Sequence, residues 1–210
     1  MLENPEIAIL ADGLPPVHPV PLGLFMTADV LVCCDGACGK ARALGRMPDY
    51  AVGDGDSISA EDKTALGERF VAVADQDTND LAKAFHFASK FNPRRIVILG
   101  ATGRREDHAL GNIFRLFDFV AEFTHVSMLT DSGIFEVVVE DRTFACRPGE
   151  AVSIFATDCR TRIHSEGLVW PLDAVRLENL YCATLNRTSG TSFRIVPTFP
   201  VLLFRTYPCQ

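Results

Sequence analysis

Residues 30–36 read Val-Leu-Val-Cys-Cys-Asp-Gly, a short apolar run that ends at an aspartate followed by a glycine. The same order recurs further along the chain, where Ala51-Val52 leads into Gly53-Asp54-Gly55-Asp56-Ser57. Short runs rich in Val, Ile and Ala are typical of strands buried on both faces of a parallel sheet. We therefore expect each run to form a strand and each acidic phrase to lie at its carboxyl end.

From residue 6 to about residue 125, such runs alternate with stretches of helical character. The other expected strands are Glu6–Leu10, Phe70–Ala74 and Arg95–Leu99, and the expected helices are Lys40–Leu44, Ala60–Glu68, Asn79–Lys90 and His108–Asp118. Ser59 and Thr78 are the expected N-caps of the second and third helices. Strands that alternate with helices indicate an α/β fold with a mostly parallel sheet, in which ligands bind beyond the carboxyl ends of the strands.

After Thr130 the sequence changes character. Short apolar or alternating runs are separated every few residues by glycine or proline, a pattern that favours an all-β sandwich or barrel. The expected strands are Ile134–Glu140, Arg142–Cys146, Ala151–Ala156, Arg160–His164, Leu177–Asn186, Thr191–Val196 and Val201–Tyr207. We predict an α/β domain over 1–128 and a sandwich-like all-β domain over 129–210, with the boundary somewhere within 126–132.

The composition excludes several classes of function. A net charge of −7 argues against broad nucleic-acid binding, which needs a basic surface. The apolar runs are too short to span a bilayer, and no secretory leader is apparent. The seven cysteines form no metal-type spacing, so they are expected to be reduced thiols in a cytoplasmic protein.

Four acidic phrases carry the expected chemistry, and we expect all of them at one edge of the sheet. They are Cys34-Asp35-Gly36-Ala37, Gly53-Asp54-Gly55-Asp56-Ser57, Asp75-Gln76-Asp77-Thr78-Asn79-Asp80 and Gly100-Ala101-Thr102-Gly103-Arg104-Arg105-Glu106-Asp107-His108. Grouped carboxylates repel one another, by about 4 kcal/mol per pair at 4 Å and an effective dielectric constant of 20. Mg²⁺ is the simplest compensating cation, because it takes oxygen ligands and shares them with substrate phosphates.

Asp54 and Asp56 are two residues apart, so in an extended segment both side chains point the same way and could form one metal-binding face with Asp35. Asp80 is expected near the N-terminus of a helix, where a carboxylate is favoured. The alternative is that Asp54 and Asp56 only cap turns. The usual nucleotide-binding loops are absent, because Gly39-Lys40 is followed by Ala41 rather than Ser or Thr.

In this order and spacing the four phrases resemble those of the thiamine pyrophosphokinase family, and Gly167-Leu168-Val169-Trp170 adds a weaker similarity. The resemblance implies that Asp35, Asp54, Asp56 and Asp80 hold Mg²⁺ and are catalytic together with Arg105. It also implies that residues of the last two phrases, and of the helices that follow them, contact the nucleotide. These residues are Gln76, Asp77, Asn79, Lys83, Gly103, Arg105, Asp107 and Asn112. Trp170 and Asn186 are the implied thiamine contacts.

The chain also departs from the family pattern at several positions. Asn79 stands in place of the usual threonine and Arg104 in place of a glycine, so Arg104 either adds a phosphate ligand or alters the loop. The other departures are Asp12, Gly39 and Leu185, which replace two asparagines and a serine. His108 is expected to make a structural hydrogen bond at a helix start rather than to act as a base.

The resemblance implies a Mg²⁺-dependent homodimeric enzyme that transfers the β,γ-pyrophosphoryl group of ATP to the hydroxyl of thiamine and releases AMP. It further implies active sites shared between the two chains. Three alternatives remain open from the sequence: a pyrophosphokinase for another hydroxymethyl heterocycle such as a pterin, a non-catalytic thiamine or nucleotide sensor, and a metal-dependent nucleotide hydrolase.

Overall fold

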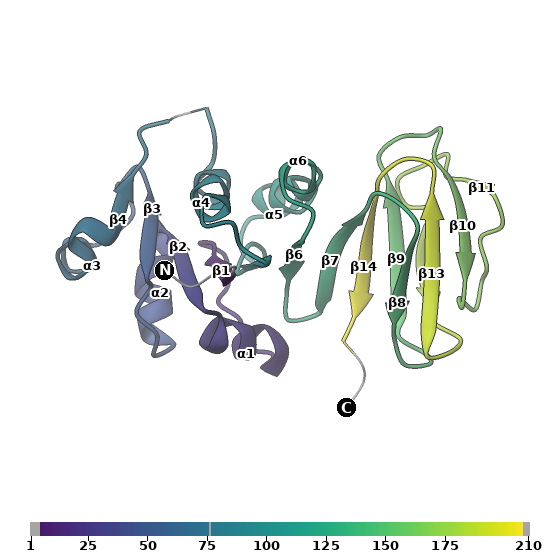
Figure 1. Cartoon of the computed structure of the whole chain (residues 1–210), viewed down its shortest axis with the longest axis horizontal. Helices are drawn as coiled ribbons and strands as arrows, with labels where there is room; N and C mark the ends of the chain where they lie inside the picture. The colour runs from purple at the N-terminus through teal and green to yellow at the C-terminus, as the bar shows by residue number, and fades with distance from the viewer. Residues whose placement is uncertain (1–4, 76, 208–210) are drawn as a thin grey trace. The chain divides into compact units, whose positions relative to one another are not determined.

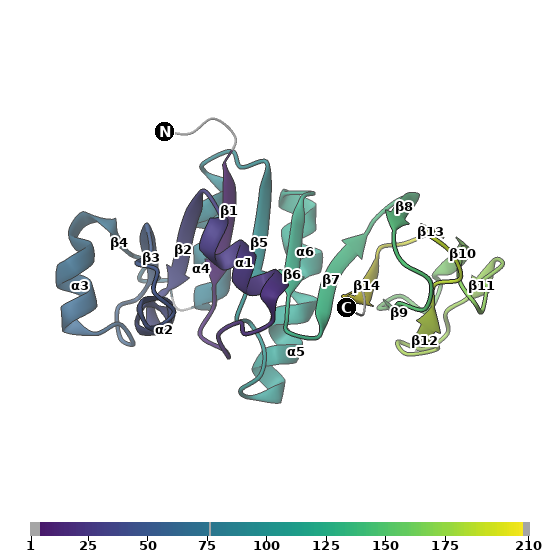
Figure 2. The ribbon, with the colours of Figure 1, turned by 90° about the horizontal axis from the view of Figure 1, so that it is seen from below.

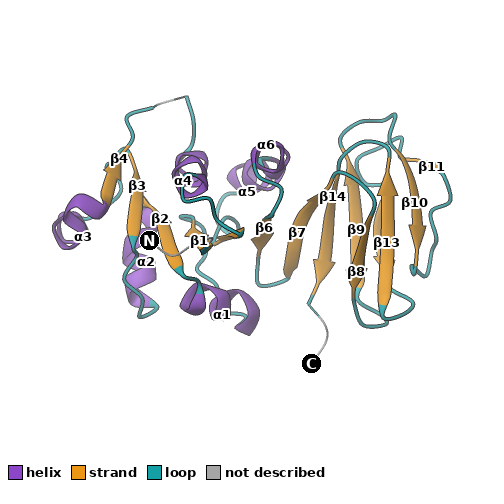
Figure 3. Ribbon diagram, in the orientation of Figure 1, coloured by secondary structure: helices purple, strands orange, loops and turns teal. Residues whose placement is uncertain are grey.

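The computed structural model describes residues 5–75 and 77–207, and the contacts within the chain divide it into two compact units, residues 1–131 and 132–210. Figure 3 shows the contrast between them, since helices and strands alternate in the first unit. In the described part of the second unit all regular elements are strands. The predicted fold class, α/β followed by a sandwich-like all-β part, is confirmed.

A parallel sheet forms the centre of the first unit (Figure 1). Its strands lie in the order β6-β5-β1-β2-β3-β4, and each neighbouring pair is parallel. Their bounds are β1 Glu6–Leu10, β2 Val30–Cys34, β3 Tyr50–Gly53, β4 Phe70–Ala72, β5 Arg95–Leu99 and β6 Val126–Leu129. Four of the five residues in each of β1, β2 and β5 are buried, as expected for strands covered on both faces.

Helices cover both faces of this sheet (Figures 1 and 2). Helices α1 and α2 lie on one face, and α4, α5 and α6 lie on the other. The helices are α1 Pro19–Thr27, α2 Cys38–Ala43, α3 Ala60–Leu66, α4 Asp80–Ser89, α5 Glu106–Phe114 and α6 Leu116–Glu122, with 3₁₀ turns at Asp35–Ala37 and Gly67–Arg69. No helix in the described part of the chain is long and apolar enough to cross a membrane.

The second unit consists of two antiparallel sheets around a common apolar core. One sheet has the order β12-β9-β14-β7 and the other β11-β10-β13-β8. The strands are β7 Gly133–Val138, β8 Arg142–Ala145, β9 Ala151–Ala156, β10 Arg162–Glu166, β11 Val175–Arg176, β12 Ala183–Arg187, β13 Ser192–Pro197 and β14 Val201–Thr206. Val152 and Leu203 from the first sheet join Ile163 and Phe193 from the second in one buried cluster.

The structure corrects several expected elements of the first unit. Helix α1 was missed because its Pro19, Pro21 and Gly23 suggest a loop, although proline is tolerated in the first turn of a helix. The single helix expected over His108–Asp118 is wrong, because α5 ends before Arg115 and α6 begins after it. Ser59 is the N-cap of α3 as predicted, whereas the N-cap of α4 is Asn79 rather than Thr78.

In the second unit, the long strand expected over Leu177–Asn186 is also wrong. Only Ala183–Arg187 pairs as a strand, and it is preceded by a turn in which the Cys182 N–H donates to the Asn179 carbonyl. The six cysteines of the described part are free, as expected, and Cys209 lies outside it. Burial raises the pKa of the Cys33 and Cys34 thiols, which favours their uncharged form.

Two loops at the carboxyl edge of the parallel sheet are joined by main-chain hydrogen bonds that continue the pairing of β1 with β5. The Gly13 N–H donates to the Gly100 carbonyl at 2.6 Å, and the Leu14 N–H donates to the Thr102 carbonyl at 2.9 Å. A Cβ atom at position 13 would lie 2.3 Å from the Gly100 oxygen and 2.4 Å from the Thr102 oxygen. The close approach of these loops therefore requires glycine at position 13.

We predict that Gly13→Ala destabilises the first unit, because the added methyl group meets main-chain oxygens that cannot rotate away. Forced overpacking of this kind costs about 1–3 kcal/mol, which corresponds to a fall of roughly 2–12 °C in melting temperature. Gly23→Ala in the exposed part of α1 is the matched control, since its Cβ would meet nothing within 4 Å. Thermal unfolding followed by circular dichroism checks the pair, and equal melting temperatures for the two variants would contradict the prediction.

Candidate active site

A cavity of about 670 Å³ opens at the carboxyl edge of the parallel sheet. Its walls come from the loops after β1, β2, β3 and β5 and from the first turns of α4 and α5. It is lined by Ala11, Asp12, Gly13, Cys34, Asp54, Thr78, Asn79, Asp80, Leu81, Lys83, Ala101, Thr102, Arg104, Arg105, His108, Ala109 and Asn112. All four acidic phrases contribute to this lining, so the expected gathering at one edge is confirmed.

Lys83 places a buried ammonium group among the carboxylates of the cavity. Its Nζ lies 3.1 Å from Oδ1 of Asp80 and 4.0 Å from Oδ2 of Asp54. The Lys83 side chain is only 4% exposed, so these ion pairs are screened less than surface pairs. Asp80 is the first residue of α4 and Lys83 stands one turn later, so both face the same side of the helix.

Burial and neighbouring charges together shift the pKa values of this pair. Burial raises the pKa of Asp80, and the nearby charges of Asp35 and Asp54 raise it further, although the hydrogen bond from Lys83 opposes them. Burial by itself would lower the pKa of Lys83, but the hydrogen bond and charge of Asp80 and the charge of Asp54 raise it overall. Lys83 therefore stays protonated and offsets only part of the repulsion.

Asp35 is buried behind the cavity and holds two main-chain segments together. Its Oδ1 accepts from the Gly36 N–H at 2.6 Å, and its Oδ2 accepts from the Gly55 N–H at 3.0 Å. The residue is 2% exposed and does not line the cavity. Both oxygens of this predicted metal ligand thus already accept hydrogen bonds, and each keeps a lone pair.

The expectation that Asp54 and Asp56 lie in an extended segment is wrong. Gly55 between them has a φ of +90°, and the Asp56 N–H donates to Oδ1 of Asp54 at 3.1 Å, so the segment turns. Asp54 lines the cavity, whereas Asp56 is exposed and lies outside the lining. Of the four aspartates predicted to bind metal, the structure brings only Asp54 and Asp80 together in the cavity wall.

Asn79 and Asn112 connect the N-terminus of α4 to the C-terminal half of α5. The Asn79 side chain caps α4 by accepting from the Ala82 N–H at 3.0 Å, and its Nδ2 donates to Oδ1 of Asn112 at 3.2 Å. Asn112 in turn donates to the Ala101 carbonyl at 2.9 Å. Both asparagines line the cavity, and their amides fix the loop after β5 relative to α4.

The remaining predicted nucleotide contacts divide between the cavity and the surface. Arg105 lines the cavity but forms a two-point ion pair with exposed Asp107, with Nε at 3.1 Å from Oδ1 and Nη2 at 2.6 Å from Oδ2. This hydrogen-bonded pair lowers the pKa of Asp107. Asp77 and Gly103 lie outside the lining, and Gln76 lies outside the described residues.

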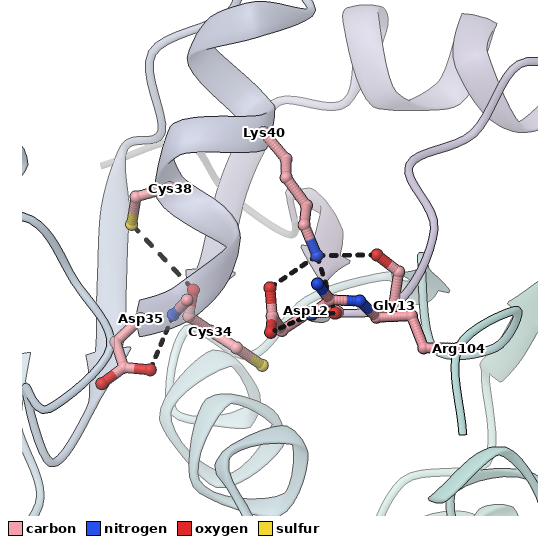
Figure 4. A network of polar contacts seen from close by, with 8 residues as sticks. Asp12, Gly13, Cys34, Asp35, Cys38, Lys40 and Arg104 are labelled. Carbon is pink, nitrogen blue, oxygen red and sulfur yellow. Dashed lines mark hydrogen bonds and ion pairs between the residues drawn. The ribbon is translucent and has the colours of Figure 1, made fainter. Parts of the chain in front are cut away.

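The sequence argument did not identify the polar cluster formed by Asp12, Lys40 and Arg104 (Figure 4). Lys40 donates to Oδ1 of Asp12 at 2.6 Å, and Arg104 donates to Oδ2 of Asp12 at 2.9 Å. Asp12 and Arg104 line the cavity beside Asp54 and Asp80. The available signal was the position of Asp12, which lies two residues beyond the carboxyl end of the expected strand Glu6–Leu10.

In the second unit, Asn186 holds the main chain of Trp170. Its Oδ1 accepts from the Trp170 N–H at 3.2 Å, and its Nδ2 donates to the Trp170 carbonyl at 2.6 Å. Asn186 is 5% exposed, whereas the Trp170 side chain lies on the surface with the residue 57% exposed. The two predicted thiamine contacts are thus brought together. The tryptophan side chain is exposed to solvent, and the buried asparagine holds its main chain.

The donor chemistry of the cavity fits Mg²⁺. Asp54 and Asp80 offer carboxylate oxygens, the ligands that this ion prefers. Within residues 5–75 and 77–207, no three Asp, Glu, His or Cys side chains are arranged to hold a metal ion by themselves. Mg²⁺ commonly takes one or two carboxylates and completes its shell with water and substrate phosphates.

The protein thus combines a parallel α/β unit, with a cavity at its strand ends, and an all-β unit. Residues 23–128 match the family model described as the catalytic domain of thiamin pyrophosphokinase, and residues 133–204 match the model of its substrate-binding domain. The chain belongs to the thiamin pyrophosphokinase family.

Comparison with individual proteins agrees with this assignment. The chain is 33% identical over 156 residues to thiamine pyrophosphokinase 1 of Oryza sativa subsp. japonica, a match covering 61% of this chain and 57% of the relative. It is 38% identical over 77 residues to thiamine pyrophosphokinase of Bacillus subtilis, covering 35% of this chain and 36% of that protein. The matched regions thus span less than two thirds of either relative.

The fold is also similar to that of a solved structure, the crystal structure of thiamine pyrophosphokinase from Bacillus subtilis. The TM-score is 0.82 at 21% sequence identity, and the superposition covers 98% of this chain and all of the other. At this level of identity the similarity establishes the fold.

We predict that Asp35→Asn lowers the stability of the metal-free protein. An amide has one oxygen, so its NH₂ group would face either the Gly36 or the Gly55 N–H and leave it without an acceptor. An unsatisfied buried donor costs about 1–3 kcal/mol. Urea unfolding in the presence of a chelator measures the effect, with Asp56→Asn as the exposed control, expected to change stability by less than about 0.5 kcal/mol. If relief of charge repulsion dominated instead, Asp35→Asn would raise the unfolding midpoint.

Proposed function

We propose that this protein is an ATP- and Mg²⁺-dependent thiamine pyrophosphokinase. The observation that carries the proposal is that the chain matches the catalytic and substrate-binding models of one family in order, at 23–128 and 133–204. The cavity adds chemical support, because it combines the Asp54 and Asp80 carboxylates with the cationic side chains of Lys83 and Arg105. A match to a thiamine-specific substrate-binding model favours thiamine over a pterin as the acceptor.

In the proposed reaction the hydroxyl oxygen of thiamine attacks the β-phosphorus of ATP. The bond between that phosphorus and the oxygen bridging it to the α-phosphorus breaks, AMP leaves with the bridging oxygen, and the hydroxyl proton is released. Thiamine diphosphate and AMP are the products. When bound, Mg²⁺ would supply charge neutralisation and a template for the phosphate oxygens, held by Asp54 and Asp80, with Asp35 and Asp56 as further predicted ligands.

The protein's own contribution is the position and the charge of its side chains. Lys83 would lie near the phosphates as a buried cation that stays protonated. Arg105 would provide a second positive charge, provided that phosphate oxygens replace Asp107 on its guanidinium. Asn79 and Asn112 would hold the N-terminus of α4 against α5 and the loop after β5, so that Lys83 and Arg105 face one ligand.

Thiamine recognition is assigned to the second unit. Trp170 presents an exposed indole, and a cationic thiazolium ring over an indole face gains about 0.5–2 kcal/mol. Asn186 would act mainly by holding the Trp170 main chain, since its amide already bonds to both the N–H and the carbonyl of that residue. We further propose a homodimer whose active sites are shared between the two chains, as the family resemblance implies. The cytoplasmic location expected from the sequence stays a prediction.

The first test of this function is the dependence of AMP release on thiamine. With Mg-ATP as the donor, the protein is expected to form AMP and thiamine diphosphate in equal amounts, and removal of Mg²⁺ by a chelator should abolish both. Chromatographic separation of nucleotides and thiamine esters checks the stoichiometry. Formation of ADP, or AMP release at the same rate without thiamine, would identify a different enzyme.

The role of Trp170 predicts a selective effect on the acceptor. Trp170→Ala should weaken thiamine binding by about 1–3 kcal/mol, combining the cation–π and apolar-area contributions, which is roughly 5- to 150-fold in affinity. Binding of ATP should change by less than twofold. Trp170→Phe keeps an aromatic face and should recover part of the loss. An equal loss for ATP and thiamine would indicate a purely structural tryptophan.

The same variant tests whether the sites are shared between chains. A heterodimer of one Asp80→Asn chain and one Trp170→Ala chain should contain one intact site and recover activity toward half of that of the wild type. The two parent homodimers serve as controls. A verified heterodimer that stays as inactive as its parents would show that both residues serve the site of their own chain.

A further inference from the structure

The strongest feature that the proposed function leaves unexplained is the cluster of Asp12, Lys40 and Arg104 (Figure 4). Lys40 extends from α2 and contacts three oxygens: Oδ1 of Asp12 at 2.6 Å, the Asp12 carbonyl at 2.7 Å and the Gly13 carbonyl at 2.8 Å. Arg104 reaches the same residue from the loop after β5, with Nη1 at 2.9 Å from Oδ2 and 3.1 Å from the carbonyl of Asp12. Each oxygen of the Asp12 carboxylate thus has its own cationic partner.

The main chain that carries Asp12 is held in place by contacts between two loops. Main-chain hydrogen bonds join the loop after β1 to the loop after β5, and Gly13 packs directly against the Gly100 and Thr102 oxygens. Asp12 is therefore held at a defined point of the cavity wall, and a side chain bound to Asp12 is held there too. A cation oriented in advance on a fixed support loses less conformational entropy when it binds a ligand.

Arg104 and Arg105 differ in which of their donors are occupied. Arg105 donates hydrogen bonds through Nε and Nη2, and both go to Asp107. Arg104 donates only through Nη1, and its Nε and Nη2 have no hydrogen-bond partner among the described residues. The Nε and Nη2 edge of a guanidinium is one that binds two oxygens of a phosphate side by side.

We propose that Arg104 is a second phosphate-binding arginine of this cavity and that Asp12, fixed by Lys40, is the residue that positions it. This inference rests on the proposed function, since it assigns Arg104 to the phosphate groups of the ATP that the site would take. The side chain of Arg104 is 58% exposed, so it remains accessible to a ligand while Asp12 holds one of its nitrogens.

The charges of the cluster agree with this assignment. One carboxylate and two cationic side chains give Asp12, Lys40 and Arg104 together a formal net charge of +1. A carboxylate in the cavity wall would repel phosphate if it stood alone, but two cations here neutralise it. The Asp12 carboxylate therefore orients Arg104 without leaving a negative charge against the ligand.

The test measures nucleotide binding directly, without turnover. The probe is an ATP analogue with a methylene bridge between the α- and β-phosphates, titrated calorimetrically in the presence of Mg²⁺, and adenosine serves as the phosphate-free comparison. Arg104→Ala should weaken binding of the analogue at least tenfold and leave adenosine binding unchanged. Arg104→Lys, which keeps the charge but loses the planar two-point donor, should fall between Arg104→Ala and the wild type.

Arg94→Ala is the matched control, because it removes the same charge just before the amino end of β5, outside the cavity lining. It should bind the analogue as the wild type does. The role of Arg104 would be overturned if the wild type binds the analogue and Arg104→Ala weakens that binding less than threefold. That outcome would leave the proposed function intact. A wild-type protein that does not bind the analogue would overturn both.

A second comparison tests the positioning role of Asp12. Asp12→Asn should weaken analogue binding about threefold in the wild-type background, because Arg104 loses its charged partner. In the Arg104→Ala background the same change should cause no loss, since nothing remains to be positioned. Equal losses in the two backgrounds would show that Asp12 acts independently of Arg104 and would overturn the positioning role.

Discussion

The site depends on the repulsion between carboxylates that a parallel sheet brings to one edge. Asp54 follows β3, Asp80 opens α4 and Asp35 follows β2, and the pKa of Asp80 is raised first by burial and then by the charges of Asp35 and Asp54. Lys83 lies among them and supplies one positive charge. This arrangement favours the binding of further cations, and a nucleotide that arrives with Mg²⁺ brings such a cation together with the phosphates.

Several side chains that have the right chemistry for ligands instead stabilise the main chain around the site. Asp35 accepts from two N–H groups, and Asn186 bonds to both main-chain groups of Trp170. Asn79 caps α4 while it also reaches Asn112. A carboxylate or amide can serve either purpose, so residue type alone does not separate the residues that touch a ligand from those that hold the wall.

This ambiguity explains why the sequence predicted the strands of the first unit better than the roles of the polar residues around the cavity. Apolar runs predicted β1, β2 and β5 with their observed bounds, because buried parallel strands leave a strong pattern. The same logic placed Asp54 and Asp80 at the cavity but failed for Asp56, since the φ of +90° at Gly55 turns the chain in a way that spacing does not reveal. Lys40 and Arg104 were missed as partners because their meeting at Asp12 depends on three segments far apart in the sequence.

The sheet order also has a consequence for how the protein is made. β1 lies between β2 and β5, so one of its edges pairs with residues 30–33 and the other with residues 95–99. During synthesis the edge that faces β5 stays unpaired until the ribosome has released the chain past Leu99. Such long-range parallel pairing folds slowly and exposes an apolar edge to other chains in the meantime. The strand that anchors the cavity wall is therefore the part of the nascent chain that a chaperone would have most reason to shield.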